Sequence, residues 1–228
     1  MAPRLRVFSS SVGTKLVIGV TGFLLFLYLL IHIGGNLLVF FGPDVFNRYA
    51  YIMEEQNALL PAIELGLLAV VLIHVFKTVG MFVGNQQARP VGYQKKRNAG
   101  GTSRKSFASS TMIVSGIWLL VFMVVHTKAF RFSPTYEWPG GGRDLYRQEM
   151  ENLSNPLVVA FYVLSMVVVG SHLWHGASSS IQSLGFDHPR WTPRVLAATK
   201  VLAAVIAGGF IIIVLWAHLT QFAGQVGQ

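Results

Sequence analysis

Five segments of the chain are apolar over about 20 residues or more, and this pattern constrains the fold more than any other feature. A bilayer core is roughly 30 Å thick, so a helix needs about 20 apolar residues to cross it. We therefore predict an all-α integral membrane protein with five transmembrane helices, in which residues 1–228 form a single transmembrane domain. The expected spans are Leu16–Phe41, Leu60–Val83, Ser110–Phe130, Pro156–Ile181 and Leu196–Gln221.

Composition agrees with a membrane protein and excludes several other classes. Hydrophobic residues make up 53% of the chain and charged residues 12%, about half the charged share of a soluble domain. The net charge of +9 does not indicate nucleic-acid binding, because the basic residues lie between the apolar segments and not on a soluble fold. There is no cysteine, which excludes disulfides, iron–sulfur ligation by this chain and covalently attached haem.

The distribution of lysine and arginine predicts the orientation in the membrane. Cytoplasmic loops of membrane proteins carry an excess of these residues. The N-terminal segment and the second and fourth loops together hold twelve of the 18, whereas the other side holds five and Lys77 lies within the second span. We expect a cytoplasmic N-terminus in a multi-pass membrane protein. The twelve are Arg4, Arg6, Lys15, Arg89, Lys95, Lys96, Arg97, Arg104, Lys105, Arg190, Arg194 and Lys200.

Histidines within the spans are the main candidates for chemistry, because ionisable groups in a membrane are costly and usually functional. One histidine lies deep in each of the first four spans. With a helical rise of about 1.5 Å per residue, His32 and His126 both lie about 24 Å from the cytoplasmic face. His74 and His172 lie about 21 and 24 Å from the opposite face. The first two are called the outer pair and the last two the inner pair.

Two histidines on facing helices suit the axial positions of a b-type haem, which needs no cysteine. The first four spans are thus expected to form a bundle that holds two haems b, with the four histidines as iron ligands. Zinc would need three or four ligands at one depth. Histidines that only donate hydrogen bonds, or that relay protons in a haem-free anchor or transporter, remain the alternatives. His175 is a possible competitor of His172, and His218 is expected to be interfacial.

Several stretches resemble the cytochrome b subunit of succinate dehydrogenase, in its single-chain, five-helix, di-haem type. The most specific is HLWHGASSSIQSLG, which is similar to that family's fourth-helix signature. The resemblance covers nearly the whole chain. The other matching stretches are Thr21–Ala50, Ala88–Lys96 and Asp144–Pro156.

The resemblance implies a membrane anchor for a flavoprotein subunit and an iron–sulfur subunit on the cytoplasmic side. Dicarboxylate chemistry of the tricarboxylic acid cycle would take place on a partner subunit. Electrons of the respiratory chain would pass between the iron–sulfur subunit, two haems b and a quinone, expected to be menaquinone. The resemblance also selects His172, and not His175, as the ligand in the fourth helix. Related fumarate reductases carry a membrane glutamate at the position of Gly170.

A quinone site needs a protonatable group, because two protons move with two electrons. Glu64, about one turn into the second span, is the preferred candidate, and Glu54 and Glu55 are alternatives. Lys77 and His175 are candidates for contact with a haem propionate or with quinone. A second site near the inner pair would be lined by Ser178, Gln182 and His175. A haem b subunit of another quinone-linked dehydrogenase is the alternative function within the same class.

Overall fold

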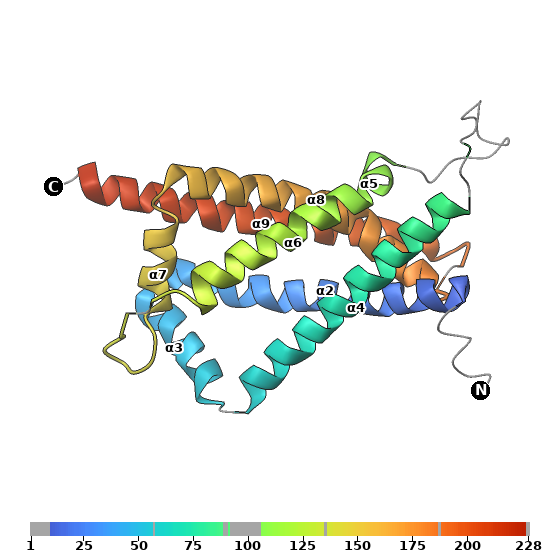
Figure 1. Cartoon of the computed structure of the whole chain (residues 1–228). Helices are drawn as coiled ribbons and strands as arrows, with labels where there is room; N and C mark the ends of the chain where they lie inside the picture. The colour runs from blue at the N-terminus through green and yellow to red at the C-terminus, as the bar shows by residue number, and fades with distance from the viewer. Residues whose placement is uncertain are drawn as a thin grey trace.

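The computed structural model describes residues 10–56, 58–88, 91, 106–134, 136–186 and 188–226, and these form helices without any β-strand. Figure 1 shows the long helices running between two ends of the molecule, with α3 and α7 at one end and the start of α2 at the other. The elements are α2 (Ser11–Asn36), η1 (Leu37–Phe41), α3 (Pro43–Glu55), α4 (Leu59–Gln87), α5 (Phe107–Ser110), α6 (Met112–Arg131), α7 (Leu145–Asn152), α8 (Pro156–Ser183) and α9 (Thr192–Val226).

Five of these helices are long and apolar enough to cross a membrane, which confirms the predicted number of spans. They cover Ser11–Phe41, Leu59–Gln87, Met112–Arg131, Pro156–Ser183 and Thr192–Gln221. The first begins five residues before the expected Leu16, because the Ser10 hydroxyl caps the helix by accepting a hydrogen bond from the Gly13 N–H at 3.0 Å. The chain is therefore a helical, multi-pass membrane protein by length and composition.

Helix α8 has well-defined ends that its sequence explains. Asn155 precedes it, and its side chain accepts a hydrogen bond from the N–H of Leu157 at 2.9 Å. Pro156 stands at the first helical position, where its missing N–H costs nothing. At the other end Gly185 adopts φ +88°, a left-handed conformation that glycine tolerates best. The predicted limits of this span are accordingly close to the observed ones.

The tightest packing lies between α8 and α9. Phe26, Val169, Leu173 and Ile206 belong to one buried cluster that joins α2, α8 and α9. A Cβ atom placed on Gly170 would lie 3.0 Å from the Cβ of Ala207, so the two helices approach closely at this point. By contrast α4 has no buried residue at all, and Figure 1 shows it inclined to the others. The fifth span is thus packed into the molecule, whereas the second lies at its periphery.

Two short helices outside the spans cover one end of the molecule. Helix α7 is short but is not simply a surface helix, since Gln148, Glu149 and Met150 are buried. Helix α3 was not predicted. Asn47 on α3 is fully buried, donates to Asp144 Oδ1 at 2.7 Å and accepts from the Tyr146 N–H at 2.9 Å. This contact joins α3 to α7.

The two sides of the membrane differ in how much of the chain is described. Among the twelve basic residues that predict a cytoplasmic N-terminus, eight lie outside the described residues. They are Arg4, Arg6, Arg89, Lys95, Lys96, Arg97, Arg104 and Lys105. Most of the matching stretch Ala88–Lys96 is also outside them.

Candidate functional site

The outer pair brings together two histidines from different helices. The ring centroids of His32 on α2 and His126 on α6 lie 5.9 Å apart, with the ring planes at 84°. Aromatic side chains surround the pair: Tyr28 stacks on His32 at 5.3 Å, and Phe130 lies 5.1 Å from His126. Phe210 of α9 also contacts His32, at 5.5 Å. The sequence predicts that His32 and His126 lie at the same depth, and in the structure their rings are in contact.

The inner pair is held by hydroxyl groups on neighbouring helices. Nδ1 of His74 on α4 lies 3.0 Å from the hydroxyl of Thr21, and that hydroxyl donates to the carbonyl of Val17 at 2.8 Å. A hydroxyl that donates to a carbonyl is available to accept from the imidazole N–H. This arrangement assigns the proton of His74 to Nδ1 and leaves Nε2 with a free lone pair.

His172 on α8 has the same arrangement. Its Nδ1 lies 2.9 Å from the hydroxyl of Ser115 on α6, and Ser115 donates to the carbonyl of Met112 at 3.0 Å. Each imidazole of the inner pair is thus held by a hydroxyl group on a neighbouring helix. Such contacts to the second ring nitrogen orient metal-binding histidines in proteins. The sequence did not reveal Thr21 and Ser115, because nothing in their spacing marks them.

The ring nitrogens of the outer pair are less firmly held. Nδ1 of His32 lies 3.4 Å from the side-chain nitrogen of Asn36, and Nδ1 of His126 lies 3.5 Å from the hydroxyl of Tyr162. Both distances are long for hydrogen bonds of this kind. They do not assign a tautomer, so the case for ligand geometry at this pair rests on the spacing of the rings.

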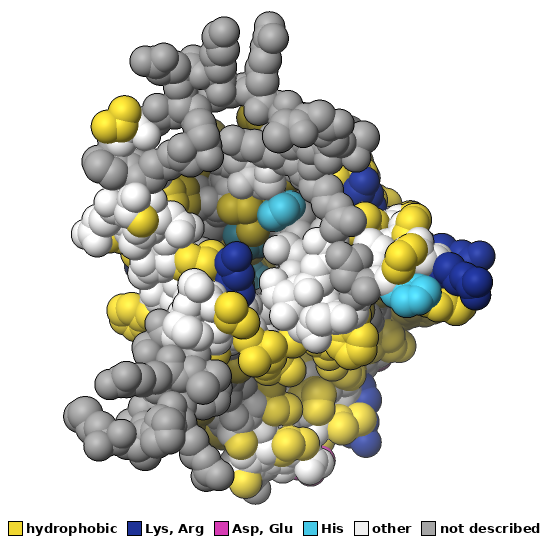
Figure 2. Space-filling view, turned by 90° about the vertical axis from the view of Figure 1, so that its right-hand side faces the viewer, with side chains coloured by type: hydrophobic (Ala, Val, Ile, Leu, Met, Phe, Trp, Pro, Cys, Tyr) yellow, Lys and Arg dark blue, Asp and Glu magenta, His cyan; other side chains and the backbone are white. Residues whose placement is uncertain are grey.

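Glycines leave room beside the inner pair. A Cβ atom on Gly22 of α2 would lie 3.2 Å from the His74 ring, and one on Gly116 of α6 would lie 3.7 Å from the His172 ring. The backbones of α2 and α6 therefore pass directly beside the imidazoles. Figure 2, which views the end where α2 begins, shows histidine side chains inside a hollow of the surface.

The other predicted site residues are placed differently. His175 lies one turn from His172 on α8, and its carbonyl accepts a hydrogen bond from the Ser178 hydroxyl at 3.0 Å. Lys77 is half-buried on α4. His218 has a structural partner, since its Nδ1 donates to the carbonyl of Leu153 at 2.9 Å and ties α9 to the end of α7.

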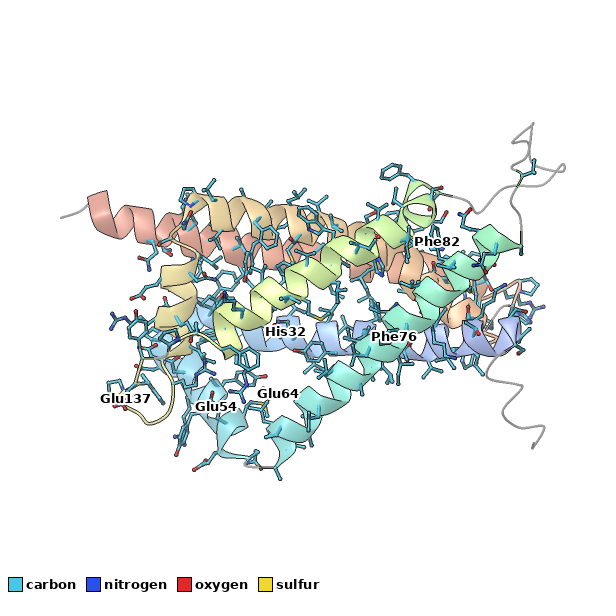
Figure 3. All side chains as sticks on the ribbon, in the orientation of Figure 1. His32, Glu54, Glu64, Phe76, Phe82 and Glu137 are labelled. Carbon is cyan, nitrogen blue, oxygen red and sulfur yellow. The ribbon has the colours of Figure 1, made fainter. Side chains whose placement is uncertain are left out.

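The predicted carboxylates lie near the α7 end, where Figure 3 labels Glu54 on α3 and Glu64 on α4. Glu64 pairs with Arg131 of α6 at 2.8 Å, and its side chain is 39% exposed. Glu54 pairs with Arg143 at 3.5 Å, whereas Glu55 is exposed and accepts from the hydroxyl of Tyr51. Glu64 thus bridges two helices that otherwise touch little.

Glu149 on α7 is a buried acid that the sequence analysis missed. It is 6% exposed, and burial raises the pKa of its carboxyl group to about 7. Tyr146 and Leu153 are spaced three and four residues from it, so the three side chains share one face of the helix. That spacing is the signal that could have indicated its burial.

Each pair offers two imidazole donors, a set that is compatible with a b-type haem and smaller than that of a multi-ligand metal site. Within the described ranges no three metal-ligating side chains converge. At the inner pair the Nδ1 atoms of both imidazoles already contact hydroxyl groups, which leaves Nε2 as the free nitrogen of each ring.

No protein-family model, curated protein or solved structure matches the chain. The functional argument therefore rests on the residues and their geometry.

Proposed function

We propose that the chain is a di-haem cytochrome b, the membrane-anchor subunit of a succinate:quinone oxidoreductase. The observation that supports the proposal is the ring contact of His32 with His126, together with the hydroxyl groups that hold Nδ1 of His74 and His172. In the proposal His32 and His126 would hold one haem b, and His74 and His172 would hold the other. A haem b would supply one-electron transfer at each pair.

The residues around each pair orient its ligands and limit access of water. Thr21 and Ser115 hold the imidazoles of the inner pair by their Nδ1 atoms, so that Nε2 is available to a metal. Tyr28, Phe130 and Phe210 enclose the outer pair with aromatic rings. An apolar surround of this kind lowers the local dielectric constant and so tunes the potential of a bound redox group.

The proposal places the start of α2 on the cytoplasmic side of a bacterial inner membrane. The iron–sulfur and flavoprotein subunits would then dock near the inner pair, and dicarboxylate chemistry would remain on those subunits. Lys77 and His175, which lie on the same helices as the inner pair, are proposed to contact a haem propionate or quinone there. A long cationic side chain such as that of Lys77 can extend from within a span toward the end where α2 begins.

Quinone chemistry near the outer pair is assigned to Glu64 in this proposal. Its ion pair with Arg131 places a carboxylate and a guanidinium together at the ends of α4 and α6. In the proposal Glu64 is the group that exchanges protons with quinone, and menaquinone is the expected substrate.

A reduced-minus-oxidised visible spectrum and a pyridine haemochrome count of the purified chain test the proposal. We expect two haems b per chain. Replacing His32 or His126 by alanine should remove one haem, and replacing His74 or His172 should remove the other. His218→Ala is the matched control, because His218 already donates to the Leu153 carbonyl and should leave both haems in place.

Three outcomes would contradict the proposal in different ways. A purified chain without a b-type band would favour the haem-free anchor with relay histidines. Two haems together with co-purifying subunits of another dehydrogenase would keep the cytochrome and replace the partner. Succinate oxidation by the isolated chain would contradict the anchor role, because that activity is expected only on the partner subunits.

A further inference from the structure

Glu149 is a buried carboxyl group at the same end of the molecule as the outer pair. It lies on α7, outside the five spans, and only 6% of its surface is exposed. The apolar residues around its helix include Met150 and Leu153, which belong to a buried cluster with Tyr162 and Val214. A carboxyl group among such residues is costly to ionise.

Two tyrosines lie on the buried side of α7. Tyr146 is three residues before Glu149 on the same helix, and Tyr162 of α8 belongs to the buried cluster that contains Met150 of α7. The hydroxyl of Tyr162 lies 3.5 Å from Nδ1 of His126, and the two ring centroids are 6.0 Å apart. Tyr162 therefore joins the buried cluster beside Glu149 to the outer pair, and in such an apolar region a change of charge at that pair is felt more strongly than it would be in water.

The two arginines nearest to Glu149 in the described part of the sequence have other partners. Arg147 pairs with Glu151, and Arg143 contacts Glu54, the carbonyl of Phe130 and Gln148. Burial is what raises the pKa of Glu149. The elements packed against α7 carry further titratable or charged groups, none of which contributes to that shift: Arg48 and Glu54 on α3, His126, Lys128 and Arg131 on α6, and His218 on α9.

We propose that Glu149 is a proton-binding site coupled to the outer pair, with Tyr162 as the intermediate side chain. When one electron from the iron–sulfur subunit adds negative charge at the outer pair, the carboxylate of Glu149 binds one proton from water at the α7 end. An O–H bond forms on the carboxylate, and it breaks again when that charge leaves. The coupling rests on the proposed function, because that function supplies the electron. The burial of Glu149 does not depend on the proposed function.

Infrared spectroscopy of the purified chain tests the buried acid without any reference to activity. The protonated carboxyl stretch should disappear as the pH rises from about 6 to about 8. It should be absent from the Glu149→Gln variant over the same range. Glu151→Gln is the matched control, since Glu151 lies on the same helix but is exposed and paired with Arg147. A wild-type spectrum identical to that of Glu149→Gln would overturn the assignment.

The pH dependence of the two haem potentials tests the coupling. The potential assigned to the outer pair should fall as the pH rises through about 7 in the wild type and in Glu151→Gln. In Glu149→Gln that dependence should be lost, while the potential at the inner pair is unchanged. An equal pH dependence in wild type and Glu149→Gln would overturn the coupling even if the infrared band titrates.

If the Glu149→Gln variant is not produced in folded form, a measurement on the wild type alone still tests the coupling. Reduction near pH 7 should add a protonated carboxyl band to the infrared difference spectrum. A reduced chain without that band would contradict the coupling. Absence of haem would overturn the proposed function and the coupling together, and the infrared titration would then still report whether Glu149 is a buried acid.

Discussion

The hydroxyl of Thr21 on α2 lies 3.0 Å from Nδ1 of His74 on α4, and it accepts the imidazole proton because it already donates to its own helix. Ser115 on α6 holds His172 in the same way. Each histidine of the inner pair is therefore oriented by a helix other than its own. The position of the pair depends on the packing of all four helices.

Thr21→Val should weaken binding at the inner pair. Valine keeps the shape of threonine but cannot accept the Nδ1 proton, and the loss of such a contact typically costs about 10–100-fold in affinity. Haem retention during dilution or competition with a haem-binding protein measures the change. Thr220→Val is the control, since the Thr220 hydroxyl bonds only to its own helix. Equal haem loss in both variants would contradict a role for Thr21.

Gly170→Val should destabilise the contact between α8 and α9. A Cβ at position 170 would lie 3.0 Å from the Cβ of Ala207, which is fixed to the backbone and cannot turn away. Overpacking of this kind costs about 1–3 kcal/mol. Thermal unfolding in detergent measures it. Gly208→Val serves for comparison, because a Cβ there meets no atom within 4 Å. The same contact explains why a larger residue, such as a membrane glutamate, does not fit at position 170.

Asn47→Ala should loosen the cover formed by α3 and α7. The substitution removes the donor to Asp144 and the acceptor of the Tyr146 N–H, which costs about 1–3 kcal/mol when the groups left behind are buried. Hydrogen exchange should become faster in both helices. Tyr51→Phe, which removes only an exposed hydrogen bond within α3, should leave the rates nearly unchanged. Protection retained in Asn47→Ala would rule out this contact as the link.

The docking of α7 should weaken as the pH rises from about 4.5 to about 7. Burial raises the pKa of Glu149 to about 7 from the value of 4.5. The folded helix therefore holds a proton that the unfolded one releases, and the lost stability amounts to about 3 kcal/mol. Below pH 4.5 the stability is full, and above pH 7 it changes no further. Hydrogen exchange of α7, compared with Glu149→Gln at each pH, measures the difference.

The five spans were predictable because apolar length is a property of the sequence alone. The depth of a residue in a straight helix follows from its position, which is why His32 and His126 were matched before their contact was known. Helix α3 was missed because it is amphipathic and its place depends on Asn47 and the distant α7. Thr21 and Ser115 were missed for a similar reason, since the rotation of neighbouring helices decides their partners.

Glu149 shows that a charged residue between two spans is not always exposed to solvent. Its neighbours in sequence, Arg147 and Glu151, are exposed and pair with each other. Only the helical spacing to Tyr146 and Leu153 distinguishes Glu149 from them, and that spacing has meaning only once α7 is known to be helical. The site residues at helix contacts therefore required the three-dimensional structure.

The absence of buried residues along α4 has a consequence for how this sequence can change over time. Where a side chain faces lipid, many apolar residues serve equally well. Most positions of α4 should therefore accept substitution by another apolar residue. His74 is an exception, because its ring meets Thr21. Nine residues of α8 are buried, and substitutions there must preserve shape as well as hydropathy. Divergence should therefore accumulate faster in the second span than in the fourth.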